Sequence, residues 1–158
     1  MKKSLFLRVT LMAWALAAAP IASSDLPSGE RLDLSDYRGK VIVVDFWASW
    51  CVPCRRSFPW LNAMNDKYAN DGLVIVGVNL DQDPASAAEF LQEYPARFQI
   101  RYDASGTLAR EFNVQAMPSS FVIDRDGEIV AHHLGFKVRR QDDYEAAIVA
   151  ALQQDTRE

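Results

Sequence analysis

The chain has 158 residues, 49% of them hydrophobic and 24% charged, which is typical of one globular domain, and its formal net charge is −4. The basic residues are scattered along the sequence, which excludes nucleic-acid binding because that function requires a concentrated basic surface. No internal repeat, low-complexity tract or linker interrupts the chain, so one main domain is expected.

The first 22 residues resemble an export signal. Residues 1–8 are basic, residues 9–19 carry no charge, and small residues follow. The apolar run is shorter than the roughly 20 residues of a membrane span and suits a secretory signal. We expect a signal peptide over residues 1–22, or an uncleaved membrane anchor, since Pro20 fits a cleavage site poorly. Without this segment, 14 basic and 21 acidic residues remain, a net charge of −7.

The remaining residues, 24–158, are expected to form one domain, which export would place in the periplasm. Strands and helices alternate along it, which predicts an α/β fold with a central mixed sheet and helices on both faces. A hairpin is indicated by the Asp-Gly turn at 126–127. The expected elements, in chain order, are a short extended piece 32–34, strand 40–46, helix 53–68, strand 73–80, helix 83–94 with Asp83 as N-cap, strand 98–102, helix 107–112, hairpin strands 119–124 and 128–134, and helix 140–152.

The only two cysteines, Cys51 and Cys54, stand three positions apart, where the strand 40–46 gives way to a helix. This junction is where α/β sheets place their chemistry. A thiolate on Cys51 would lie at the positive end of the helix dipole and could accept the free backbone N–H of Cys54. Thiols in such motifs have pKa values lowered from about 8.5 to as little as about 3.5–7. Cys51 is therefore the expected nucleophile, and Cys54, deeper in the helix, the resolving thiol.

Two other interpretations of the cysteine pair are weaker. A structural zinc site needs four ligands, and only His132 and His133, on a distant strand, could join the cysteines. A structural disulfide closing so short a loop would stabilise the fold little. The pair is therefore interpreted as a redox-active dithiol, with no metal and no other cofactor expected.

Two motifs resemble the thioredoxin superfamily, and within it the exported TlpA/ResA-like thiol:disulfide oxidoreductases. They are Val44-Asp-Phe-Trp-Ala-Ser-Trp-Cys-Val-Pro-Cys54 and Met117-Pro-Ser-Ser-Phe-Val-Ile-Asp-Arg-Asp-Gly127, and the similarity extends over about residues 30–152. The resemblance implies a thioredoxin fold with an insertion after the second central strand, here about residues 81–103. It also implies that Pro118 is a cis-proline and that Met117 offers its backbone to substrate, an ordinary trans proline being the alternative.

Further substrate contacts are expected from the residues around the cysteines. Of Trp47 and Trp50, Trp50 is the one expected to touch substrate, and Val52 and Pro53 lie between the two thiols. Pro53 suits the first turn of a helix, where its missing N–H costs nothing. His132 and His133 alternate on a strand, one toward the sheet's packed face and one toward solvent, and neither is assigned a catalytic role.

Asp45 interrupts an otherwise apolar strand. A buried carboxylate is costly unless it is neutral or has a task. The resemblance implies a proton acceptor and donor for the resolving thiol at this position, the alternative being a structural acid held by hydrogen bonds. Many ResA-like sequences instead carry asparagine there and glutamate at the position of Gln82, so this chain departs from their pattern.

The expected activity is reduction of disulfides in exported client proteins, because the Val-Pro dipeptide lacks the histidine of strongly oxidising relatives and a buried acid disfavours a neighbouring thiolate. The resemblance implies a membrane electron donor of the DsbD or CcdA kind and a role in cytochrome c maturation. We expect a monomer. A periplasmic oxidase or isomerase and a non-enzymatic metal-delivery module remain the alternatives.

Overall fold

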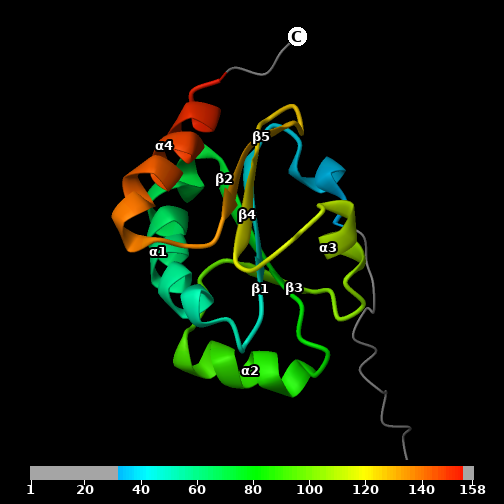
Figure 1. The fold of residues 1–158 in the computed structure, drawn as a ribbon. Coiled ribbons are helices and arrows are strands. Elements are labelled where there is room, and N and C mark those ends of the chain that lie inside the picture. Colours follow the sequence, from blue (N-terminus) through cyan, green and yellow to red (C-terminus); the bar gives the residue numbers. More distant parts are fainter. Residues whose placement is uncertain (1–31, 155–158) are drawn as a thin grey trace, which may run out of the picture.

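The computed structural model describes residues 32–154, and the expected signal or anchor at 1–22 lies outside them. A five-stranded sheet in the order β3-β2-β1-β4-β5 forms the centre (Figure 1). β1 pairs with β2 in parallel and with β4 antiparallel, which makes the sheet mixed as predicted. The elements are β1 (Val41–Trp47), α1 (Val52–Tyr68), β2 (Leu73–Asn79), α2 (Pro84–Glu93), β3 (Gln99–Tyr102), α3 (Thr107–Glu111), β4 (Ser119–Ile123), β5 (Ile129–Leu134) and α4 (Gln141–Leu152), with 3-10 turns η1 (Leu34–Tyr37), η2 (Ala69–Asp71) and η3 (Val138–Arg140).

The central strand β1 is buried along its whole length, because layers cover both of its faces. Successive side chains alternate between the faces. Val41, Val43 and Trp47 pack in one cluster with residues of α1 and α4. Ile42, Val44 and Phe46 pack in a second cluster with Leu108 of α3. By this alternation Asp45 belongs to the face that α1 and α4 cover.

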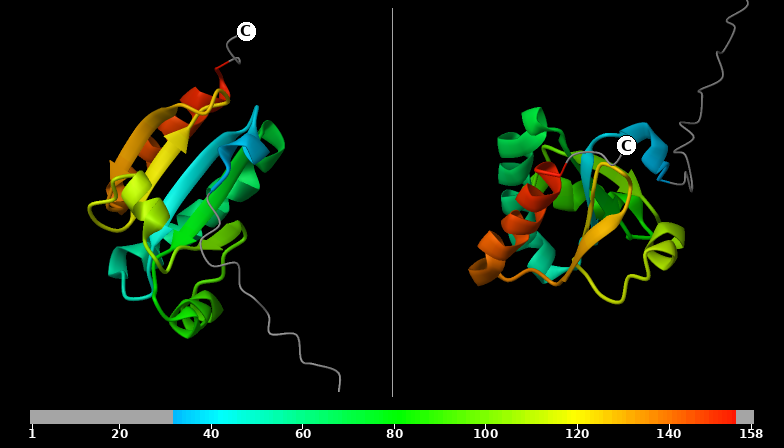
Figure 2. Two further views of the ribbon diagram at one scale, coloured as in Figure 1. Left: turned by 90° about the vertical axis from the view of Figure 1, so that its right-hand side faces the viewer. Right: turned by 90° about the horizontal axis from the view of Figure 1, so that it is seen from above.

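Helices lie on both faces of the sheet, as Figure 2 shows from two further directions. α1 and α4 run side by side on one face, and α3 and η1 lie on the other. The rings of Trp47, Phe58 and Phe90 pack at centroid distances of 4.8–4.9 Å, in the same buried cluster as both cysteines. The strand end that leads to the cysteines is therefore held by the aromatic core.

The insertion expected at residues 81–103 contains α2 and β3. Asp83 accepts a hydrogen bond from the N–H of Ala85, which confirms it as the N-cap of α2. β3 pairs in parallel with β2 and so widens the sheet by one edge strand. No helix within residues 32–154 is long and apolar enough to cross a membrane.

One local prediction was wrong. Of the extended piece expected at 32–34, Asp33 has an extended backbone, but Leu34 already belongs to the 3-10 turn η1. The side chain of Asp33 accepts a hydrogen bond from the N–H of Ser35, 2.9 Å away, and thereby starts the turn.

Candidate active site

Cys51 and Cys54 are joined by a disulfide at the junction between β1 and α1. Cys51 is the N-cap of α1, and Cys54 lies in its first turn together with Pro53. Cys54 is completely buried and Cys51 is 3% exposed, so only Cys51 presents surface to a reaction partner. This arrangement agrees with the roles expected for the two thiols.

The hydrogen bonding around the pair differs from the expectation in one respect. The N–H of Cys54 was expected to be free for a thiolate, but in this disulfide form it donates to the backbone carbonyl of Cys51 at 3.1 Å. The carbonyl of Cys54 in turn accepts from the hydroxyl of Ser57 at 3.0 Å. The N–H of Cys54 is thus paired with the backbone while the cysteines are oxidised.

Apolar side chains beside the disulfide are open to solvent. Trp50 is 67% exposed and Val52 is 58% exposed, while Pro53 is half-buried. Large exposed apolar groups next to a reactive bond suit contact with a partner protein. Arg55 and Arg56 lie exposed on the following turn of the helix.

The second motif brings the Met117–Pro118 segment into the same neighbourhood. Its peptide bond is cis, as the resemblance implied. Met117 is half-buried and packs against the cluster that contains Cys51 and Cys54, whereas Pro118 is buried. The carbonyl of Pro118 already accepts from the N–H of Gly135 at 2.8 Å. Met117 is therefore the more accessible of these two predicted substrate residues.

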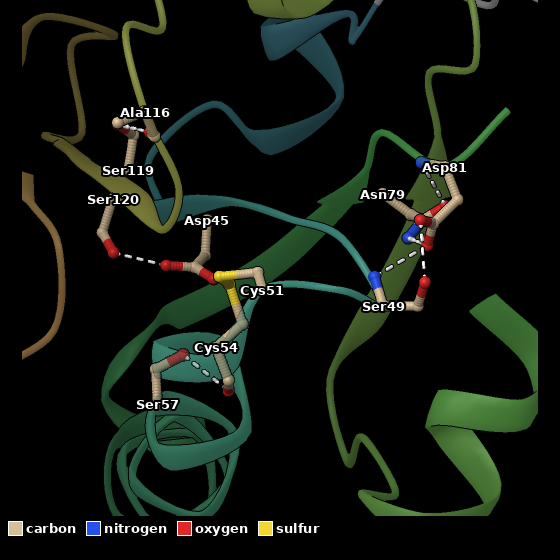
Figure 3. The surroundings of a disulfide bond; sticks show 10 residues. All are labelled: Asp45, Ser49, Cys51, Cys54, Ser57, Asn79, Asp81, Ala116, Ser119 and Ser120. Atoms are coloured by element: carbon tan, nitrogen blue, oxygen red, sulfur yellow. Dashed lines mark hydrogen bonds between the residues drawn. A yellow bond between two sulfur atoms is a disulfide. The ribbon is translucent and has the colours of Figure 1, made fainter. Parts of the chain in front are cut away.

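The carboxyl of Asp45 points from β1 toward the disulfide in Figure 3 and is fully buried. One oxygen, Oδ1, accepts a hydrogen bond from the hydroxyl of Ser120 on β4. The other, Oδ2, is buried and has no hydrogen-bond partner within residues 32–154. Burial raises the pKa of Asp45 to about 7, against the opposing effect of the Ser120 hydrogen bond. An acid with this pKa can exchange a proton near neutral pH.

A second buried acid, Asp81, has a different environment. Its carboxylate accepts from the N–H and the hydroxyl of Ser49, both at 2.9 Å, and from the side-chain amide of Asn79 at 2.7 Å (Figure 3). Asp81 thereby ties the end of β2 to the loop that carries Trp50 and Cys51. Gln82, the next residue, is exposed.

Sequence reasoning missed Ser49 and Ser120, because a serine in a loop or strand has no distinguishing pattern. The strand register brings Ser120 to Asp45, and the loops that follow β1 and β2 bring Ser49 to Asp81. Within the described part of the chain, no group of three or more His, Cys, Asp or Glu side chains could hold a metal ion.

The sequence of the chain is similar to those of known proteins. A family model described as Redoxin matches residues 17–148. The ResA thiol-disulfide oxidoreductase of Geobacillus kaustophilus is 33% identical over 124 residues, which cover 78% of this chain and 71% of the relative. The ResA of Bacillus thuringiensis is 29% identical over 113 residues, and the match spans 65% of that relative's length.

Solved structures share the fold. A Chlorobium tepidum protein described as a thiol:disulfide interchange protein DsbE superimposes with a TM-score of 0.74 and 46% identity, covering 75% of this chain and 84% of that one. StoA of Bacillus subtilis superimposes with a TM-score of 0.61 and 26% identity, covering 70% and 83%. The chain therefore belongs to the redoxin family and, within the thioredoxin superfamily, to the ResA-like thiol-disulfide oxidoreductases.

Proposed function

We propose that this protein reduces disulfides in exported client proteins through its Cys51–Cys54 pair. The observation that carries the proposal is the asymmetry of the site. On the outer side, Cys51 is the less buried cysteine and lies beside the exposed Trp50 and Val52. On the inner side, Cys54 is fully buried, and the Asp45 carboxyl points toward the pair.

The chemistry follows from this asymmetry. In the reduced protein the Cys51 thiolate attacks a client disulfide, which gives a mixed disulfide and releases the first client thiolate. Cys54 then passes its proton to the Asp45 carboxylate and attacks the sulfur of Cys51. The intramolecular disulfide forms, and the second client thiolate leaves; both client thiolates take protons from solvent. Two electrons pass from the protein to the client.

The proposed direction rests on the surroundings of the thiols. A buried acid opposes negative charge on a neighbouring sulfur, so the reduced form gains little from thiolate formation. A poorly stabilised thiolate favours the low potential of a reductant. An extracytoplasmic reductase then needs an electron donor in the membrane, of the DsbD or CcdA kind. Apocytochromes c awaiting haem would be suitable clients.

A glutathione titration of the purified protein tests the direction. We expect a potential near that of thioredoxin, about −270 mV, rather than near the DsbA value of about −120 mV. A value above about −200 mV would instead identify an oxidase or isomerase. Intact-mass measurement of the exported protein would show whether residues 1–22 are removed.

Trapping of clients tests the roles of the two thiols. In the variant Cys54→Ser, Cys51 can still attack but the mixed disulfide cannot be resolved, so covalent complexes with clients should accumulate in the exported compartment. The matched variant Cys51→Ser should trap nothing. The reverse result would exchange the two roles.

A further inference from the structure

The buried position of Asp45 requires a route for its proton. The side chain has no exposed surface and lies on the central strand of the sheet, between β2 and β4. A carboxyl that changes its protonation state there must exchange the proton with solvent through neighbouring polar groups.

The register of the sheet supplies a row of such groups. Asp45 on β1 is paired with Ser120 on β4, and Ser120 is paired with His133 on β5. Directly paired residues project from the same face of a sheet. The row therefore runs on the side of α1 and α4, from the central strand to the edge strand β5, where His133 is half-buried.

The contacts within this row are those of an incomplete chain of hydrogen bonds. The Ser120 hydroxyl donates to Oδ1 of Asp45. The Nε2 atom of His133 is buried and lacks a hydrogen-bond partner among residues 32–154. Ser120 and His133 line one small cavity. The centre of a water molecule could occupy about 10 Å³ of it. That volume is close to the minimum that holds one water, and polar groups of this kind are the partners a buried water needs.

We propose that Ser120 and His133 form the path by which the Asp45 carboxyl exchanges its proton with solvent. When Asp45 is protonated, its O–H donates to the oxygen of Ser120, and the hydroxyl proton of Ser120 passes to a water in the cavity. That water gives a proton to the ring of His133, which releases one to solvent. Each member gains and loses one proton, and the reverse sequence returns a proton to the Asp45 carboxylate.

The surroundings of His133 keep it able to accept that proton. Burial lowers the pKa of His133, and the charges of Arg140 and His132 lower it further, whereas Asp143 raises it. The ring also packs against Tyr144 of α4 at a centroid distance of 4.8 Å. His133 is therefore predominantly neutral at pH 7, with a nitrogen lone pair free for a proton. Neighbouring His132 points to the other face and stacks on Phe121, which makes it a matched control.

The path can be tested by carbon-13 NMR of the aspartate carboxyls in the oxidised full chain, with Asp45→Asn identifying the Asp45 signal. In the unaltered protein this signal should move continuously with pH, with a midpoint near 7, because exchange is fast. In Ser120→Ala and in His133→Gln the signal should broaden or split near the midpoint, because fast exchange is lost. Ser120→Thr, which keeps the hydroxyl, and His132→Gln should retain the single moving signal.

The possible results distinguish a proton path through Ser120 and His133 from a general structural effect of the substitutions. They also test the path independently of the proposed function. Fast exchange preserved in both Ser120→Ala and His133→Gln would overturn the proposal, as would equal broadening in His132→Gln. The use of this path in catalysis rests on the proposed reductase function, but the NMR measurement needs no client. A protein that fails to reduce clients while its Asp45 exchange depends on Ser120 and His133 would retain the path and lose the function.

Discussion

Asp45 shows how far a single residue can be interpreted from sequence. An acid within an apolar strand is recognisable in the sequence as unusual, because a buried carboxyl must be neutral or have its charge balanced by partners. Its partner Ser120 and the more distant His133 have no such signal, since serine and histidine are ordinary residues of a hairpin. Their relation to Asp45 depends on the pairing of β1, β4 and β5, which the sequence does not specify at single-residue precision.

Replacing Asp45 with asparagine should separate its chemical from its structural role. Asparagine has nearly the same shape but cannot take the proton of Cys54, so client reduction should slow by about 10- to 10⁴-fold. Stopped-flow measurement of the reduced protein with a client disulfide would show the effect in the resolving step. Unchanged turnover at pH 7 would contradict the shuttle role.

The same substitution should change the pH dependence of stability. The pKa of Asp45 is raised to about 7 in the fold, from an ordinary value of 3.8, so the folded protein binds the proton more tightly than the unfolded chain. The resulting stability is complete below the ordinary pKa and is lost as pH rises through 7. Asp45→Asn should therefore gain in unfolding free energy relative to the parent between about pH 4 and 7, and stay level above. Denaturant titrations of the oxidised parent and variant at several pH values measure this. A difference in unfolding free energy that does not change with pH would contradict the raised pKa of Asp45.

At the scale of elements, the sequence predicted the strands and helices within one or two residues, because buried strands and capped helices carry strong local patterns. The misassigned segment was η1, whose turn depends on one side-chain contact of Asp33. The loop before Cys51 could not be predicted either. Its shape depends on Asp81, which lies 32 residues from Ser49 in sequence.

The substitution Asp81→Asn tests whether the loop before Cys51 needs the carboxylate of Asp81. The amide would place a donor against the donors of Ser49 and Asn79, so unfolding free energy should fall by about 1–3 kcal/mol. Client reduction should fall with it, without a change in the pH profile. Asp83→Asn is the control, because asparagine caps a helix as well as aspartate and stability should hardly change. A shifted pH profile at full stability would make Asp81 a proton-transfer group instead.

At the scale of the molecule, the cysteine pair and a stabilising arginine lie at opposite ends of the sheet. The disulfide comes after the C-terminal end of β1, whereas Arg125 contacts Gly39, just before the N-terminal end of β1. The guanidinium of Arg125 donates to the carbonyl of Gly39 at 2.7 Å and to those of Asp71 and Leu152 at 3.2 Å. It thus joins the start of β1, the turn before β2 and the end of α4.

Arg125→Ala should lower the unfolding free energy by about 1.5–3 kcal/mol, because three backbone carbonyls lose a charged donor. The redox potential should stay the same, since the site lies at the other end of β1. Arg125→Lys should restore only part of the stability, because a single ammonium cannot reproduce the planar fork. Thermal unfolding and the glutathione titration, made on the same samples, measure both quantities, and a shifted potential in Arg125→Ala would contradict this separation.

The order of the strands also determines which parts of the molecule open first. β1 is paired on both sides and fully buried, so its amides should be among the slowest to exchange with heavy water. β5 is an edge strand with largely exposed side chains, and it should fray at far lower free energy. Such fraying would part His133 from Ser120 while Asp45 and the disulfide stay enclosed. The proton path can thus open and close by local unfolding, while the Cys51–Cys54 pair keeps its place in the fold.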